Sequence, residues 1–121
     1  MDPGSLDETA FAHLLEITGD DLAFVDELVD TYLEDARGQL EAMRVAAASD
    51  DAEGLVRPAH SLKSSSANVG ALGLAELCRQ LETDARSGPV PDATARAAAI
   101  SEAFAQVEVA LLDARRERSP G

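Results

Sequence analysis

Residues 59–71 read Ala-His-Ser-Leu-Lys-Ser-Ser-Ser-Ala-Asn-Val-Gly-Ala, and this stretch predicts both a packed helix and a chemically available histidine. Spacings of four, three, four and three residues, the period of one face of an α-helix, separate Leu55, Ala59, Leu62, Ser66 and Val69. His60 falls on a different face, which it shares with Lys63, Ser64 and Ala67. If the first face packs into a core, the imidazole points to water, beside a cation and small side chains. The pattern therefore indicates a histidine that another molecule reaches.

The same helical period recurs along the whole chain and is interrupted only by short turns. We expect helices over residues 6–17, 22–47, 51–69, 72–86 and 92–116. No alternation typical of a β-strand competes with this pattern. Four long amphipathic helices with short connections predict an all-α antiparallel four-helix bundle, with the additional short N-terminal helix packed across one end. We expect residues 1–5 to be a disordered N-terminus, residues 6–117 to form the bundle domain and residues 118–121 to be a flexible C-terminus.

Aspartate and glycine residues mark where these helices begin and end. Asp20 or Asp21 is placed to cap the second long stretch, because an Asp side chain accepts a hydrogen bond from the free N–H groups of a helix start. Asp50 with Glu53 resembles a capping box at the start of the histidine helix. Gly70 suits the left-handed position that follows the end of that helix.

The chain of 121 residues carries a formal net charge of −13, which argues against several classes of function. Binding to nucleic acid or to anionic membrane surfaces needs clustered Lys and Arg. No apolar run approaches the roughly 18 residues that span a bilayer, and the chain does not open with a basic-then-apolar signal sequence. The single cysteine, Cys78, has no partner for an internal disulfide. We therefore expect one soluble, monomeric domain in the cytoplasm.

Metal and nucleotide chemistry finds little support in the sequence. A di-iron carboxylate bundle needs Glu-x-x-His pairs on two helices, whereas residues 57–60 read Arg-Pro-Ala-His and residues 10–13 read Ala-Phe-Ala-His. Two histidines and one cysteine disfavour a zinc site, and no glycine-rich loop indicates an ATP site. We interpret His13 as a surface or end-of-core residue and Cys78 as a small core residue. We expect no metal, no cofactor and no autonomous enzyme activity.

Glu82 is the candidate partner of the His60 imidazole. It lies on the inner half of the next predicted helix, at a height comparable with His60. A carboxylate there accepts a hydrogen bond from Nδ1–H, which fixes the tautomer and leaves Nε2 unprotonated as a nucleophile. The alternative, which the sequence leaves open, is a solvated surface glutamate. Lys63, one turn from His60, is placed to offset the charge of a phosphoryl group on the ring.

The histidine segment resembles the histidine-containing phosphotransfer (HPt) domains of multistep phosphorelays. The family pattern is Ala-His-x-Leu-Lys-Gly-Ser/Ala-x-x-x-Val/Ile-Gly-Ala/Leu, followed by a Leu-rich helix. Residues 59–71 are similar to this pattern, and residues 74–82 read Leu-Ala-Glu-Leu-Cys-Arg-Gln-Leu-Glu. Residues 21–43 are similar to the family's preceding helix, so the likeness covers nearly the whole domain.

This resemblance implies a site and a set of partners. It implies that His60 is phosphorylated at Nε2, that Lys63 contacts the phosphoryl oxygens and that Glu82 holds Nδ1. The implied function is to carry a phosphoryl group between the aspartates of response-regulator receiver domains, with sensor histidine kinases as further partners and Mg²⁺ on the receiver. The docking surface is expected at small and apolar residues around the histidine: Val56, Ser64, Ala67, Gly70 and Ala71.

Some positions are unusual for the family and keep two alternatives open. Ser64 replaces the usual Gly, and Pro58 lies two residues before the histidine. At the position of Glu82, relay members often have Gln, whereas Glu is more like the phosphorylatable first domain of chemotaxis kinases. One alternative is therefore a domain that a histidine kinase phosphorylates directly. The other is an adaptor that binds a receiver without carrying phosphate.

Overall fold

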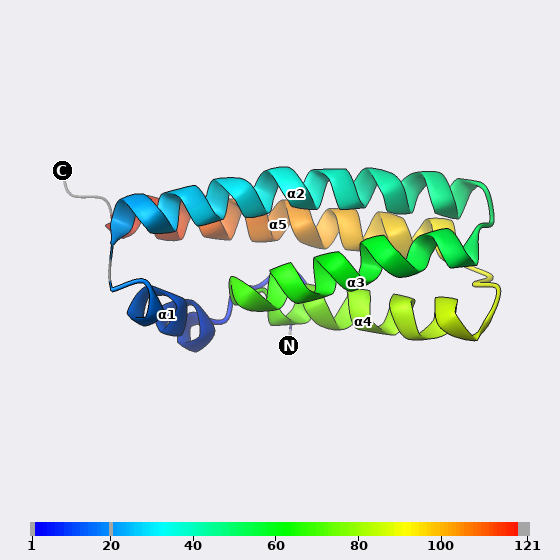
Figure 1. Ribbon diagram of the computed structural model, residues 1–121, viewed down its shortest axis with the longest axis horizontal. Helices are drawn as coiled ribbons and strands as arrows, with labels where there is room; N and C mark the ends of the chain where they lie inside the picture. Colours follow the sequence, from blue (N-terminus) through cyan, green and yellow to red (C-terminus); the bar gives the residue numbers. More distant parts are fainter. Residues whose placement is uncertain (1, 20, 119–121) are drawn as a thin grey trace.

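Five helices make up nearly all of the protein, for which the computed structural model describes residues 2–19 and 21–118. They are α1 (Glu8–Ile17), α2 (Leu22–Ala48), α3 (Ala52–Asn68), α4 (Leu72–Ser87) and α5 (Ala93–Arg118). Figure 1 shows α2 to α5 as long rods along the long axis of the molecule, each running in the direction opposite to the one before it, with α1 at one end. The predicted all-α antiparallel four-helix bundle with an additional N-terminal helix is confirmed. None of the described helices is both long and apolar enough to span a membrane.

Aspartate side chains cap three of the helices. Asp7, Asp21 and Asp51 each accept a hydrogen bond from the backbone N–H three residues further on, over 2.8, 3.2 and 2.9 Å. The cap of α3 is therefore one residue later than the expected capping box at Asp50. Asp50 has a left-handed φ of 53°, so it belongs to the turn before the helix. Asp20, the alternative cap of α2, lies outside the described residues.

The short helix α1 is joined to the C-terminal end of α3 by backbone contacts. Asp7 N–H donates to the carbonyl oxygen of Gly70 over 2.7 Å, and Phe11 and Leu15 of α1 are buried. Gly70 has a φ of 88°, and a Cβ there would lie 3.0 Å from the Asp7 carbonyl oxygen. Because only glycine takes this φ without strain, Gly70 both ends α3 and lets α1 approach.

Residues 2–5, which we expected to be disordered, form a turn against the bundle. Gly4 N–H donates to Asp2 Oδ1 over 3.0 Å, and Gly4 is buried. A Cβ at Gly73 would collide with the Asp2 carbonyl oxygen, so the turn lies directly on the first turn of α4. The small residues on both sides permit this close packing. The expected flexible C-terminus lies outside the described residues except for its first residue, which α5 still includes.

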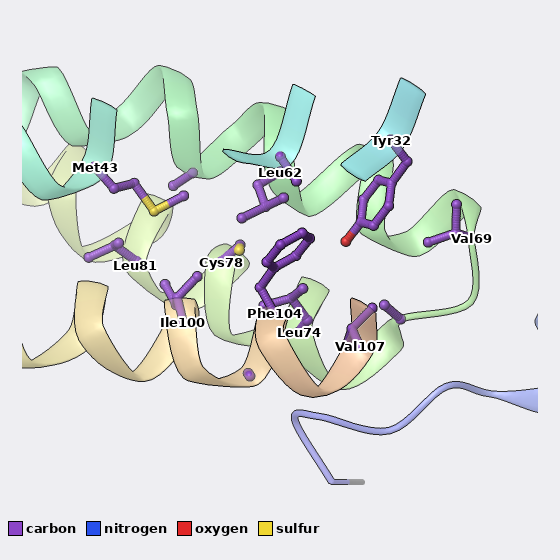
Figure 2. Packing of buried hydrophobic residues seen from close by; sticks show 14 of the residues in the cluster. Tyr32, Met43, Leu62, Val69, Leu74, Cys78, Leu81, Ile100, Phe104 and Val107 are labelled. Carbon is purple, nitrogen blue, oxygen red and sulfur yellow. The ribbon is translucent and has the colours of Figure 1, made fainter. Parts of the chain in front are cut away.

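The core lies mainly between the four long helices and is mostly aliphatic, with the rings of Tyr32 and Phe104 within it (Figure 2). Its largest fully buried residues are Met43, Leu55, Leu62, Leu74, Leu81, Ile100 and Leu111. One polar pair enters this core: the Tyr32 hydroxyl of α2 lies 2.8 Å from the Ser66 hydroxyl of α3. Because Ser66 is fully buried, this hydrogen bond satisfies its hydroxyl and adds to the apolar contacts that keep this face of α3 in the core. The opposite face of α3 is left for solvent.

Candidate functional site

α3 presents the His60 side chain to solvent because the residues beside it are packed into the core. The predicted buried face is confirmed, since Leu55, Ala59, Leu62, Ser66 and Val69 are all buried. Pro58 is buried as well, and α3 continues through it. The His60 side chain is 54% exposed. The core therefore fixes the backbone of the histidine, while the imidazole stays accessible to another molecule.

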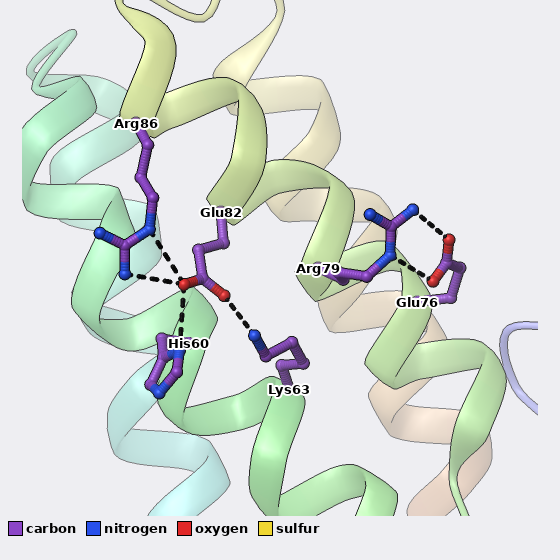
Figure 3. Close-up of polar contacts among 6 residues, drawn as sticks. All are labelled: His60, Lys63, Glu76, Arg79, Glu82 and Arg86. Atoms are coloured by element: carbon purple, nitrogen blue, oxygen red, sulfur yellow. Dashed lines mark hydrogen bonds and ion pairs between the residues drawn. The ribbon is translucent and has the colours of Figure 1, made fainter.

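Glu82 of α4 provides the acceptor for the His60 ring. His60 Nδ1 lies 3.0 Å from Glu82 Oε2. An ionised carboxylate only accepts hydrogen bonds, so Nδ1 carries the hydrogen, and in the neutral ring Nε2 is then the nitrogen with the lone pair. Figure 3 shows the second ring nitrogen on the side away from Glu82. The Glu82 side chain is only 9% exposed, so the alternative of a solvated surface glutamate is wrong.

Two cations hold the Glu82 carboxylate, one on each oxygen (Figure 3). Lys63 Nζ lies 2.8 Å from Oε1, and Arg86 donates to Oε2 from Nε over 3.1 Å and from Nη2 over 2.8 Å. These contacts, that of Lys63 foremost, outweigh the opposing effect of burial and lower the pKa of Glu82 to about 2. Glu82 is therefore ionised near neutral pH, and it accepts the hydrogen bond from Nδ1 without taking the proton.

The sequence indicates Lys63 as a site residue but does not indicate Arg86. Lys63 was singled out as a phosphoryl contact, and the structure places it on Glu82, with its side chain 30% exposed. Its contact with a phosphoryl group stays a prediction. Arg86 was missed, although its i,i+4 spacing from Glu82 is typical of an ion pair along one helix. That spacing was the available signal, but it indicates an ion pair without indicating a site.

The expected docking residues divide into two groups. Ser64 and Ala67 are exposed on the His60 face of α3, and Val56 is half-buried against the core. Gly70 and Ala71 are buried, and Ala71 is fully so, which makes their assignment to a docking surface wrong. The reason is the turn after α3, where α1 covers Gly70 and the Ala71 N–H bonds back to the α3 carbonyl of residue 66 over 2.8 Å.

The remaining candidate groups lie apart from this cluster. The His13 side chain is 73% exposed on α1, with Nδ1 3.7 Å from Glu16 Oε2. Cys78 is fully buried, and burial raises its pKa to about 12, so its reactive thiolate form is suppressed. Within the described part of the chain, no group of three or more His, Cys, Asp or Glu residues is arranged to hold a metal ion.

Two known proteins are similar to this chain over part or most of its length. The chain is 36% identical over 67 residues to the sensor protein TorS of Escherichia coli (strain K12), a match that covers 55% of the chain and 7% of TorS. The chain thus spans a small part of that relative. Its fold is similar to the crystal structure of histidine-containing phosphotransfer protein B (HptB) from Pseudomonas aeruginosa PAO1. The TM-score is 0.83 at 33% identity, covering 93% of this chain and 95% of that one.

The family model of the Hpt domain matches residues 27–110, which is more than half of the chain. The matched segment contains His60, Lys63, Glu82 and Arg86, the whole of the cluster described above. The chain is therefore a member of the Hpt domain family and has a histidine phosphotransfer role in a two-component phosphorelay.

Proposed function

We propose that His60 is the phosphoacceptor and that it carries a phosphoryl group from the aspartate of one receiver domain to the aspartate of another. One observation supports this assignment above the others. The ring is 54% exposed, and its Nδ1–H is held by a buried carboxylate at 3.0 Å, so Nε2 faces outward with its lone pair. A fixed tautomer on an accessible ring is what nucleophilic attack on phosphorus requires.

In the loading step, the Nε2 lone pair attacks the phosphorus of the receiver's phosphoaspartate. The bond between phosphorus and the aspartate oxygen breaks, and the electron pair leaves with the aspartate carboxylate. The ring gains a positive charge because both its nitrogens are then substituted. Glu82 lies 3.0 Å from Nδ1 and stabilises this charge, and with a pKa of about 2 it leaves the proton on the ring. Unloading reverses these bond changes toward a second aspartate.

Lys63 is the residue of this chain that is best placed to meet the negative charge of the phosphoryl group. It lies one helical turn from His60, and a flexible ammonium can move from Glu82 Oε1 toward a phosphoryl oxygen. Transfer also needs charge stabilisation on the donor side. We assign that part to Mg²⁺ and the acidic residues of the receiver, so this chain acts as a carrier and not as an autonomous enzyme.

A receiver would dock on the face of α3 that carries the histidine. Ser64 and Ala67 add little bulk there, and Asn68, one turn beyond Ser64, borders an apolar groove of about 420 Å³ between α1, α2 and α3. The apolar side chains that line this groove are Leu14, Ile17, Leu28, Tyr32 and Val69. Ile17 is 68% exposed, so covering it with a partner removes apolar surface from water. A monomeric carrier in the cytoplasm would use this one face for donor and acceptor in turn.

The test is transfer from a purified receiver domain that carries radiolabelled phosphoaspartate. We expect the label to move to the wild-type chain and not to His60→Gln. His13→Gln is the matched control, because it removes the other histidine, which is exposed on α1. Label on His60→Gln would contradict the proposal.

Two further measurements distinguish the relay from the two alternative functions, direct phosphorylation by a kinase and receiver binding without phosphate. Labelling by a histidine kinase and ATP without any receiver would favour direct phosphorylation over the relay. Receiver binding by the wild-type chain, with no phosphohistidine from any donor, would favour the adaptor.

A further inference from the structure

Arg86 has a place in the His60 cluster that the family motif does not explain. It lies in the last turn of α4 and donates to Glu82 Oε2 from two nitrogens, over 3.1 and 2.8 Å. The same oxygen accepts from His60 Nδ1 over 3.0 Å, whereas Lys63 lies against the other oxygen at 2.8 Å. Glu82 is thus held by one cation at each oxygen, and the His60 imidazole is its third partner among the described residues (Figure 3).

This arrangement suggests what would happen without the arginine. A neutral imidazole attracts a carboxylate less strongly than an ammonium group does, because hydrogen bonds between two ions are stronger. With Arg86 gone, Lys63 would be the only cation on Glu82, and the carboxylate would be free to turn both oxygens toward it. The Oε2 to Nδ1 hydrogen bond would then lengthen or break. The two donors of the Arg86 guanidinium, Nε and Nη2 (the fork of Arg86), oppose this rotation because both contact Oε2.

We propose that Arg86 is a positioning residue for phosphoryl transfer: it holds Glu82 Oε2 against His60 Nδ1 and thereby keeps the ring in the Nδ1–H tautomer. This inference rests on the proposed function, in which Nε2 is the nucleophile. Arg86 acts through Glu82 and need not touch the phosphoryl group. It also leaves the cluster of Glu82, Lys63 and Arg86 with one net positive charge, on a chain whose formal net charge is −13.

The chain contains a matched control for this proposal. Arg79 lies on the same helix and pairs with Glu76 through the same two guanidinium nitrogens, Nε and Nη2, over 2.7 and 2.5 Å. That pair is separate from His60 (Figure 3). Arg79→Gln removes the same charge and one ion pair of α4 without touching Glu82. Any effect of lost charge or of lost helix stability therefore appears in both variants.

The experiment reads the tautomer and the transfer rate in the same variants. Nitrogen NMR of isotopically labelled histidine gives the share of His60 in the Nδ1–H form without any phosphate. We expect Arg86→Gln to lower that share and to slow transfer from a phosphorylated receiver about tenfold. Arg79→Gln should match the wild type in both. Arg86→Lys restores the charge without the fork, so its tautomer share and rate should lie between those of wild type and Arg86→Gln.

The outcomes separate this inference from the proposed function. If Arg86→Gln keeps the wild-type tautomer share, or if Arg79→Gln changes it equally, the inference is wrong, whatever the transfer rates. If the wild-type chain takes up no phosphate, the proposed function fails, while the NMR comparison still tests the effect of Arg86 on the ring.

Discussion

Glu82 Oε2 lies 3.0 Å from His60 Nδ1, although the two residues are 22 positions apart and belong to different helices. The antiparallel packing of α3 on α4 brings them together, and burial of Glu82 makes the contact specific. An exposed carboxylate would be shared with water, whereas this one has His60, Lys63 and Arg86 as its described partners. The contact therefore fixes which ring nitrogen is available for chemistry.

Substitution of Glu82 should separate its geometry from its charge. Glu82→Gln keeps an oxygen that accepts from Nδ1–H and loses the ionic contacts. A hydrogen bond to a charged group is worth roughly 1 kcal/mol more than a neutral one, so we expect transfer about fivefold slower. Glu82→Ala removes the acceptor and should slow transfer further, by about 10- to 100-fold, because a hydrogen bond to a charged group is worth about 1.5–3 kcal/mol. Single-turnover transfer from a phosphorylated receiver measures the rates of both variants, with Glu76→Gln as the control. Equal rates for Glu82→Ala and wild type would contradict a role of Glu82 in transfer.

Acid should remove the stabilisation that Glu82 provides. Its pKa is lowered from 4.5 to about 2 in the fold, so the folded state favours the ionised form. The contribution is fully present above pH 4.5 and is lost as the pH falls toward 2. The shift in pKa corresponds to roughly 3 kcal/mol of free energy of unfolding. Because Lys63 and Arg86 are partly exposed and water screens their charges, we expect Glu82 to contribute about 1–2 kcal/mol.

Urea unfolding of wild type and Glu82→Gln across this pH range measures that contribution. The gap between their free energies of unfolding should narrow as the pH falls from 4.5 to 2. If the difference in free energy of unfolding between the two proteins stays the same down to pH 2, Glu82 is not held as an anion in the fold.

The hydrogen bond between Tyr32 and Ser66 should stabilise the fold and keep α3 in its orientation. Tyr32→Phe leaves the fully buried Ser66 hydroxyl without its partner, which should cost about 1–3 kcal/mol. The double variant Tyr32→Phe with Ser66→Ala removes both polar groups and should recover part of this loss. Chemical unfolding of the single and double variants tests the coupling, and strictly additive losses would contradict it.

Docking over the His60 face should be sensitive to bulk and charge at Ala67. Ala67→Glu places a long acidic side chain one turn beyond Ser64 and should weaken receiver binding at least about tenfold, because it obstructs the contact surface. Ala105→Glu is the control, since Ala105 is also exposed but lies on α5, on the other side of the bundle from α3. Titration calorimetry with a receiver domain measures the two affinities. Equal weakening by both substitutions would indicate a general charge effect instead of this surface.

Much of the fold follows from the period of apolar residues. The face of α3 from Leu55 to Val69 was predicted residue by residue, because a continuous helix allows one buried face only. The cap of α3 was misplaced by one residue, since both Asp50 and Asp51 suit a cap and only the backbone conformation of the turn decides between them.

The site was harder to predict because its contacts lie between helices. His60 and its exposure follow from α3 alone, and Glu82 follows from the expected antiparallel packing. The role of Arg86 depends on the rotamer that brings its fork to Oε2, which helix spacing does not give. Gly70 and Ala71 were misassigned to the surface because the position of α1 over that turn is a tertiary contact without a local sequence signal.

The central claim is that the hydrogen bond from His60 Nδ1–H to Glu82 leaves Nε2 as the atom that takes the phosphoryl group. Phosphorus–nitrogen NMR of the isotopically labelled chain, loaded by a phosphorylated receiver, identifies the modified atom directly. We expect coupling of phosphorus to His60 Nε2, with the hydrogen remaining on Nδ1. Phosphorus on Nδ1, on His13 or on no histidine at all would contradict this account.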